Sequence, residues 1–119
     1  MKLLFIIPLF LFDSLKGQTD YQFDKTLHYF AGMGISVATG EIALQIKDNN
    51  AIALSSGFVL GSCAGIAKEV YDRDVRKTHF DINDALTTAW GACNGMIVLR
   101  VAIDLREKKT YLKNTELYE

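Results

Sequence analysis

The sequence has little proline, cysteine or tryptophan, and its charges almost cancel. One proline and nine glycines in 119 residues, with the glycines inside apolar runs, do not suit a loop-rich β domain and favour helix. A formal net charge of −1 leaves no basic face to neutralise phosphates, which argues against nucleic acid as a partner. Because this length suits one domain only, we expect a single all-α unit.

Signatures of catalysis and of cofactor binding are also missing. The chain contains no Gly-x-Ser-x-Gly elbow, no phosphate-binding glycine loop and no His-Glu-x-x-His helix. Its cysteines, Cys63 and Cys93, and two distant histidines do not make a zinc signature. In an exported chain these cysteines can form one disulfide, but their small, apolar surroundings favour two buried thiols. We therefore predict no cofactor and assign no catalytic residue.

The first residues have the pattern of a secretory signal. Lys2 precedes an uncharged apolar stretch over 3–12 and a short polar exit over 13–18. About ten apolar residues are too few to span a bilayer, so cleavage after Gly17 is favoured over an uncleaved anchor. No cysteine lies near the exit, so no lipid anchor is expected. The pattern predicts export to the cell envelope, facing the periplasm, at the inner or the outer membrane.

Three helical segments follow, over about 23–46, 51–71 and 82–105. Lys47 to Asn50 form a polar break with turn chemistry, and a charged connector covers 72–80. Asp81 is a predicted N-cap, with Asp84 in the acidic position of a capping box. The expected organisation is a signal peptide (1–17), a three-helix membrane-associated domain (18–105) and a polar C-terminal tail (106–119).

Glycines recur at helical spacing on one face of the second and third segments. At ~100° per residue, each set falls within one narrow arc. Glycines four residues apart let helix backbones approach closely, which matters most where lipid removes the hydrophobic drive between helices. We expect close helix packing through Gly57, Gly61, Gly65, Gly91 and Gly95.

Charged residues are absent from long stretches of the same segments, residues 51–67 and 85–99. A soluble three-helix bundle normally shows a charged outer face on every helix. Both segments are also near the lower length for a membrane span. We therefore predict three closely packed, glycine-rich apolar helices that lie in or against a membrane and contact its lipid, rather than a soluble bundle.

Polar side chains gather at matching ends of the three segments. Asp24 and His28 lie one turn apart on the first, where a carboxylate can orient the imidazole. A short connector keeps the end of the second segment level with the start of the third, and antiparallel packing brings the first segment there. The predicted cluster contains Asp24, His28, Lys68, Glu69, Asp72 and Asp84.

Three roles are open to this cluster. Carboxylates and imidazole suit several divalent metals, and they also serve as acid–base groups in hydrolases. Alternatively, the cluster pairs charges across helices and fixes their register. Lys68 favours this structural role, because its ammonium supplies part of the charge that a metal would. The sequence leaves open whether a metal binds.

Three motifs in this cluster and the glycine faces occur in order: Asp24-Lys25-x-x-His28, Gly65-x-x-Lys68-Glu69-x-Tyr71-Asp72, and Asp84 followed by Gly91-Ala92-x-x-Gly95. Together they resemble the YfiM-type lipoproteins of Gram-negative bacteria, and the first also resembles VanZ-like membrane proteins. The resemblance covers residues 24–95. It implies a small envelope protein with no established catalytic residues.

These observations predict a small non-enzymatic membrane protein of the cell envelope that acts as a scaffold or accessory subunit. Glycine-mediated helix packing is expected to join it to a larger envelope complex or to copies of itself. The alternative is a small membrane hydrolase or metal-binding protein that uses the His/Asp/Glu cluster. No nucleic-acid partner is expected.

Overall fold

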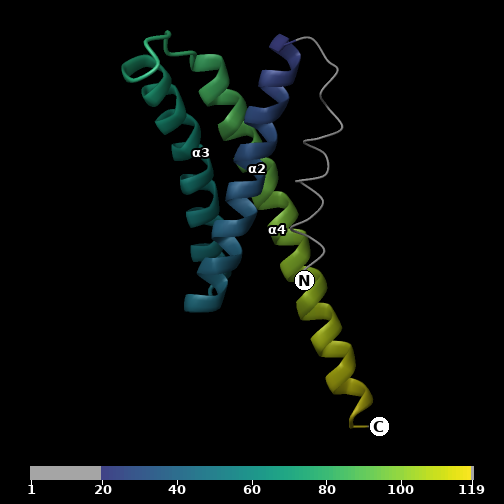
Figure 1. Cartoon of the computed structure of the whole chain (residues 1–119). Coiled ribbons are helices and arrows are strands. Elements are labelled where there is room, and N and C mark those ends of the chain that lie inside the picture. The colour runs from purple at the N-terminus through teal and green to yellow at the C-terminus, as the bar shows by residue number, and fades with distance from the viewer. Residues whose placement is uncertain (1–19, 119) are drawn as a thin grey trace.

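The described part of the chain folds into three long helices that pack side by side. The computed structural model describes residues 20–118, in the order α2 (Asp20–Lys47), α3 (Asn50–Asp74) and α4 (Ile82–Glu116). Consecutive helices run antiparallel, so the start of α2, the end of α3 and the start of α4 lie at one end of the bundle (Figure 1). The all-α prediction is confirmed for the described residues, and the predicted signal peptide lies outside them.

The helix ends follow local capping chemistry. Asp48 has a φ of 46°, a left-handed conformation that ends α2. Asn49 begins α3 by accepting a hydrogen bond from the backbone N–H of Ile52 at 3.0 Å. Asp81 begins α4 by accepting one from the N–H of Asn83 at 2.8 Å, which confirms it as the N-cap. Side-chain oxygens thus satisfy N–H groups that the first helical turns leave unpaired.

Small residues form the contacts between the helices. A Cβ atom at Gly91 would overlap the carbonyl oxygen of Tyr29, so no larger residue fits there unless the backbone moves. Each of the five predicted packing glycines lies against another helix of this same chain: Gly57 and Gly61 against Ser36 and Gly32 of α2, Gly65 against Thr88 of α4, and Gly91 and Gly95 against Tyr29 and Met33 of α2. The two glycine faces are therefore occupied within the chain.

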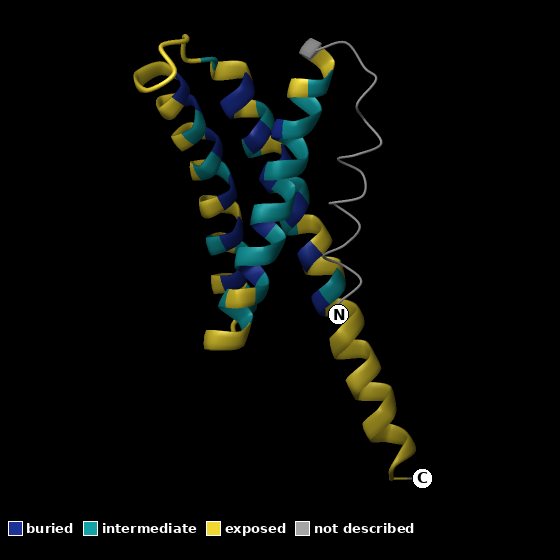
Figure 2. Ribbon diagram, viewed as in Figure 1, coloured by how far each residue is buried: buried dark blue, intermediate teal, exposed yellow. Residues whose placement is uncertain are grey.

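The interior contains few large apolar side chains, because most of these lie on the outside. Buried residues of α3 lie on the side that faces α2, and exposed residues lie on its outer side (Figure 2). The buried hydrophobic residues within 20–118 are Ala53, Ala85, Ala92, Leu99 and Ile103. By contrast, Val59 and Ile66 on α3 and Trp90 and Ile97 on α4 are each at least half exposed. A bundle folded in water normally has the opposite distribution, with large aliphatic side chains inside.

Two of the helices are long and apolar enough to cross a membrane, namely α3 and α4. This length and composition agree with the predicted membrane association. Only a minor part of the apolar stretch is buried in either helix, 22% in α3 and 33% in α4. Both helices therefore turn apolar surface away from the bundle.

The last helix is longer than the sequence indicated. We expected a helix end near Leu105 and a polar tail over 106–119, but α4 continues to Glu116 and projects past the ends of α2 and α3 (Figure 1). Good helix formers such as Arg, Glu, Lys and Leu are frequent here, and glycine and proline are absent after Gly95, so nothing in the sequence stops the helix. Every residue from 104 to 118 is exposed.

Candidate functional site

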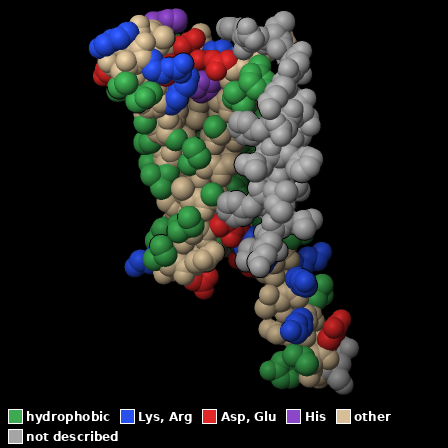
Figure 3. All heavy atoms as spheres, viewed as in Figure 1, with side chains coloured by type: hydrophobic (Ala, Val, Ile, Leu, Met, Phe, Trp, Pro, Cys, Tyr) green, Lys and Arg blue, Asp and Glu red, His purple; other side chains and the backbone are tan. Residues whose placement is uncertain are grey.

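Titratable side chains from all three helices meet at the end of the bundle where α4 begins. Charged and histidine side chains gather at this end, and hydrophobic side chains form patches on the flank below them (Figure 3). His28, Glu69 and Asp84 are each at most 6% exposed. We call this group the polar layer; its members are Asp24, Lys25, His28, Lys68, Glu69, Asp72, Asp84 and Thr88.

His28 on α2 is held by a hydroxyl on α4. Its Nδ1 lies 3.0 Å from Thr88 Oγ1, and that hydroxyl donates its one hydrogen to the backbone carbonyl of Asp84 at 2.9 Å. Since the hydroxyl hydrogen is already used, Nδ1 must carry a proton and donate to Thr88. In neutral His28 the lone pair therefore lies on Nε2, directed into the polar layer.

Lys68 on α3 occupies the position that this lone pair faces. Its Nζ lies 3.0 Å from His28 Nε2, 3.1 Å from Glu69 Oε1 and 2.9 Å from Asp72 Oδ2. An ammonium has three N–H groups, so these three acceptors use all of them. Lys68 is thus the central cation of the polar layer.

Glu69 connects α3 to the start of α4. Its Oε1 accepts from Lys68, and its Oε2 accepts from the backbone N–H of Asp81 at 2.9 Å. In a capping box Asp84 would take that N–H, so the predicted capping-box role of Asp84 is wrong. Asp84 forms an ion pair with Lys25 of α2 instead. The N–H of Asn83 and the charge of nearby Lys25 hold the pKa of Asp81 below its usual value.

The structure brings together all six residues of the predicted cluster and adds Lys25 and Thr88. Lys25 was present in the first motif, but its pairing with Asp84 depends on how α2 is rotated against α4. Thr88 was visible only as a polar residue on a small-residue face. The predicted cluster contains more carboxylates than cations, and buried acids require cations or hydrogen-bond donors nearby. This excess is the sequence signal that could have indicated Lys25 as a further member.

One subset of the polar layer has the spacing of a metal site. One ligand atom each from Asp24, His28 and Asp84 lie within 4.8 Å of one another. The nearest carboxylate oxygen to His28 Nε2 is Asp84 Oδ2 at 3.5 Å, followed by Glu69 Oε1 at 3.8 Å and Asp24 Oδ2 at 3.9 Å. An ion bound here would need the Nε2 lone pair that Lys68 now contacts. Lys68 is partly exposed, so its side chain has room to turn away.

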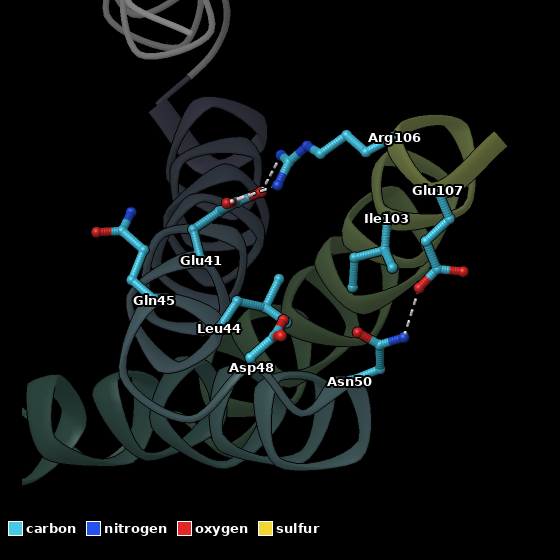
Figure 4. Close-up of a pocket in the computed structure, with 8 residues that line it drawn as sticks. All are labelled: Glu41, Leu44, Gln45, Asp48, Asn50, Ile103, Arg106 and Glu107. Carbon is cyan, nitrogen blue, oxygen red and sulfur yellow. Dashed lines mark hydrogen bonds and ion pairs between the residues drawn. The ribbon is translucent and has the colours of Figure 1, made fainter. Parts of the chain in front are cut away.

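The opposite end of the bundle carries a second, smaller set of polar contacts (Figure 4). Glu41 of α2 forms an ion pair with Arg106 of α4, and the Asn50 amide donates to Glu107 at 3.0 Å. These contacts surround a cavity of about 250 Å³ between the three helices, and Asp48 also lines this cavity. The two polar sets therefore mark both ends of the apolar section.

The two cysteines are free, and Cys63 is exposed while Cys93 is half-buried. The expectation that both thiols are buried is wrong for Cys63. This residue lies on the outward side of α3, turned away from the face that carries Gly57, Gly61 and Gly65. Helical spacing separates the two sides, because Cys63 lies two residues from both Gly61 and Gly65 and so ~200° around the helix.

Comparison of the chain with protein-family models, with curated proteins and with solved structures finds no match. The polar layer and the distribution of apolar side chains are therefore the basis for any functional assignment.

Proposed function

We propose that this chain is a small non-enzymatic membrane protein of the cell envelope, which acts as a scaffold or accessory subunit. The observation that carries this proposal is the inverted distribution of side chains. Glycine, alanine, serine and threonine fill much of the interior, and the large aliphatic and aromatic residues of α3 and α4 face outward. Small residues at helix contacts and large apolar ones outside are typical of helices surrounded by lipid.

The length of the uncharged section supports the same placement. Residues 51–67 of α3 carry no charged side chain, and at ~1.5 Å per residue they cover roughly 25 Å. The hydrocarbon core of a bilayer is ~30 Å thick. The polar layer and the Glu41–Arg106 pair lie at the two ends of this section, where lipid headgroups and water are available.

Contacts with partners must use the outward side chains. The packing glycines are already in contact with other helices of the same chain, so they build the unit rather than join it to another protein. Membrane lipid covers the apolar faces of α3 and α4, and a larger envelope complex or a second copy binds part of the same surface. The polar layer keeps the three helices in register, which is the best-attested use of buried charged groups. The resemblance to YfiM-type envelope proteins and export through residues 1–17 belong to the same proposal.

Fractionation of tagged protein on a density gradient, followed by alkaline extraction of each membrane fraction, tests this proposal. We expect the protein to stay in an alkali-resistant membrane pellet, and the fraction that contains it identifies the membrane. Release into the soluble fraction would overturn the membrane placement. The exposed apolar faces would then need a protein partner to cover them.

A second candidate is a small membrane hydrolase or metal-binding protein, which the spacing of Asp24, His28 and Asp84 favours. Calorimetric titration of the purified protein with zinc distinguishes it from a scaffold. The metal-binding candidate predicts one bound ion, lost in Asp84→Asn but kept in Asp104→Asn, because Asp104 is an exposed acid outside the layer. It also predicts tighter binding in Lys68→Met, which removes the competing ammonium. If none of these proteins binds zinc saturably, the cluster is not a zinc site.

A further inference from the structure

Aliphatic residues on one side of α4 remain exposed, because no other helix of the described chain buries them. Val98, Val101, Leu105 and Leu112 are 45%, 52%, 63% and 52% exposed. Their spacings of three, four and seven residues are those of the apolar seam in a two-stranded coiled coil. We call these four residues the α4 stripe.

The α4 stripe continues past the end of the bundle. The part of α4 after Ile103 is exposed on all sides, yet it is helical up to Glu116. A single helical segment of this length is marginal in water, because most helical stability in proteins comes from packing. Packing along its apolar side would therefore stabilise the projecting section.

A membrane surface does not suit the projecting section. α4 is uninterrupted from Ile82 to Glu116 and has neither glycine nor proline after Gly95, the usual causes of a sharp bend. A straight helix that crosses the bilayer beside α2 and α3 leaves the lipid beyond the Glu41–Arg106 pair. Leu105 lies at this level and Leu112 lies beyond it, so a partner at the Leu112 end is a protein rather than lipid.

We infer that the partner on the α4 stripe is a second copy of the same chain. The two copies pack along this stripe with their α4 helices parallel. Copies inserted in the same direction present the same stripe to each other, which gives a two-fold symmetric contact. In that register Asp104 of one helix lies beside Lys109 of the other, at positions where coiled coils place opposite charges. Asp104 already pairs with Arg100 at 3.2 Å, and both are about half exposed, so the second copy's lysine joins an accessible carboxylate. Lys108 is the one polar residue at a seam position, and it lowers the stability of the contact because the lysines of the two copies lie near each other.

This inference rests on the proposed role as a packing subunit and names the partner. Cysteine cross-linking in native membranes tests it, in full-length protein that carries Cys63→Ser and Cys93→Ser. Single cysteines are then placed in the α4 stripe, as Leu105→Cys or Leu112→Cys, and on the opposite side of the projecting section, as Thr110→Cys. After mild oxidation we expect a band of twice the monomer mass from the two stripe variants, at about five times the yield of Thr110→Cys, because seam positions lie within disulfide distance.

A charge exchange checks the register. Lys109→Asp in the Leu112→Cys protein puts two carboxylates together and is expected to lower the dimer yield about fivefold. Adding Asp104→Lys restores the opposite pair and the yield. Equal cross-linking at Leu112→Cys and Thr110→Cys, no cross-linking, or an adduct of another mass would each overturn the second copy as partner.

Alkaline extraction of the same samples measures membrane placement separately. A membrane pellet without stripe-specific dimers would overturn this inference and leave the membrane placement intact. Stripe-specific dimers in a soluble fraction would support the second copy and overturn the membrane placement.

Discussion

A lysine in place of Val59 separates a chain surrounded by lipid from a bundle surrounded by water. Val59 is 52% exposed on the outward side of α3, in the middle of the uncharged residues 51–67. In water, a lysine at such a surface position changes the free energy of unfolding by less than ~0.5 kcal/mol. At the centre of a membrane helix a lysine costs ~3 kcal/mol, which lowers the ratio of inserted to non-inserted protein about a hundredfold.

Val70→Lys is the matched control. Val70 lies on the same side of α3 and is 37% exposed, but it is next to Lys68 and Glu69 of the polar layer. A lysine there reaches headgroups and water with its long side chain, so its cost in a membrane is small. Val59→Lys and Val70→Lys are thus the same substitution on the same side of α3, at two different depths in the proposed membrane.

The fraction of each variant that resists alkaline extraction, measured beside its total abundance, gives the result. We expect Val59→Lys to lose most of its membrane-inserted fraction and Val70→Lys to behave like the unaltered chain. If both variants stay near the unaltered chain, the outward face of α3 is in water or covered by protein, and the membrane reasoning is refuted. Equal losses in both would also refute it, because the effect would not depend on depth.

Three further predictions concern stability in detergent, measured by thermal unfolding. Gly91→Ala is expected to lower the free energy of unfolding by ~1–3 kcal/mol, because the added Cβ overpacks against α2. Gly34→Ala has open space around its Cβ and is expected to raise the free energy of unfolding by up to ~1 kcal/mol through helix propensity. Equal effects of the two substitutions would contradict the close contact at Gly91. Ser36→Ala is expected to be neutral or stabilising, because its buried hydroxyl has no hydrogen-bond partner in the described structure, and a loss above ~1 kcal/mol would contradict this. The pKa of Asp81 is lower in the folded protein than its unfolded value of ~3.9, so its carboxylate stabilises the fold above that pH, and this contribution disappears as the pH falls through the lowered pKa. The difference in stability between the unaltered protein and Asp81→Ala should therefore be present at neutral pH and shrink in acid. A difference that does not change with pH would contradict this prediction.

Local signals were sufficient to predict the fold class and the starts of α3 and α4. The polar break over residues 47–50 and the capping residue Asp81 act within one turn, and the structure places helix starts beside both. The end of α4 is harder to predict, because the change to polar residues after Leu105 suggests a helix end that the structure does not have. Polarity alone does not end a helix, and no glycine or proline is present to do so.

The members of the polar layer were predictable because helical spacing and the short connector restrict where they lie. Their pairing was not predictable. Lys25 pairs with Asp84, and Glu41 pairs with Arg106. Glu69 accepts the hydrogen bond from the Asp81 N–H that a capping box would use. These choices depend on the rotation of each helix, which is fixed by glycine contacts such as Gly91 against Tyr29.

The central position of Lys68 has a consequence for how the fold responds to its surroundings. Helices bridged by a bound divalent ion separate when a chelator removes that ion. Here the counterion is a side chain, attached to α3 by covalent bonds and held by His28, Glu69 and Asp72. It cannot diffuse away, so this contact between α2 and α3 persists in a medium depleted of calcium, magnesium or zinc.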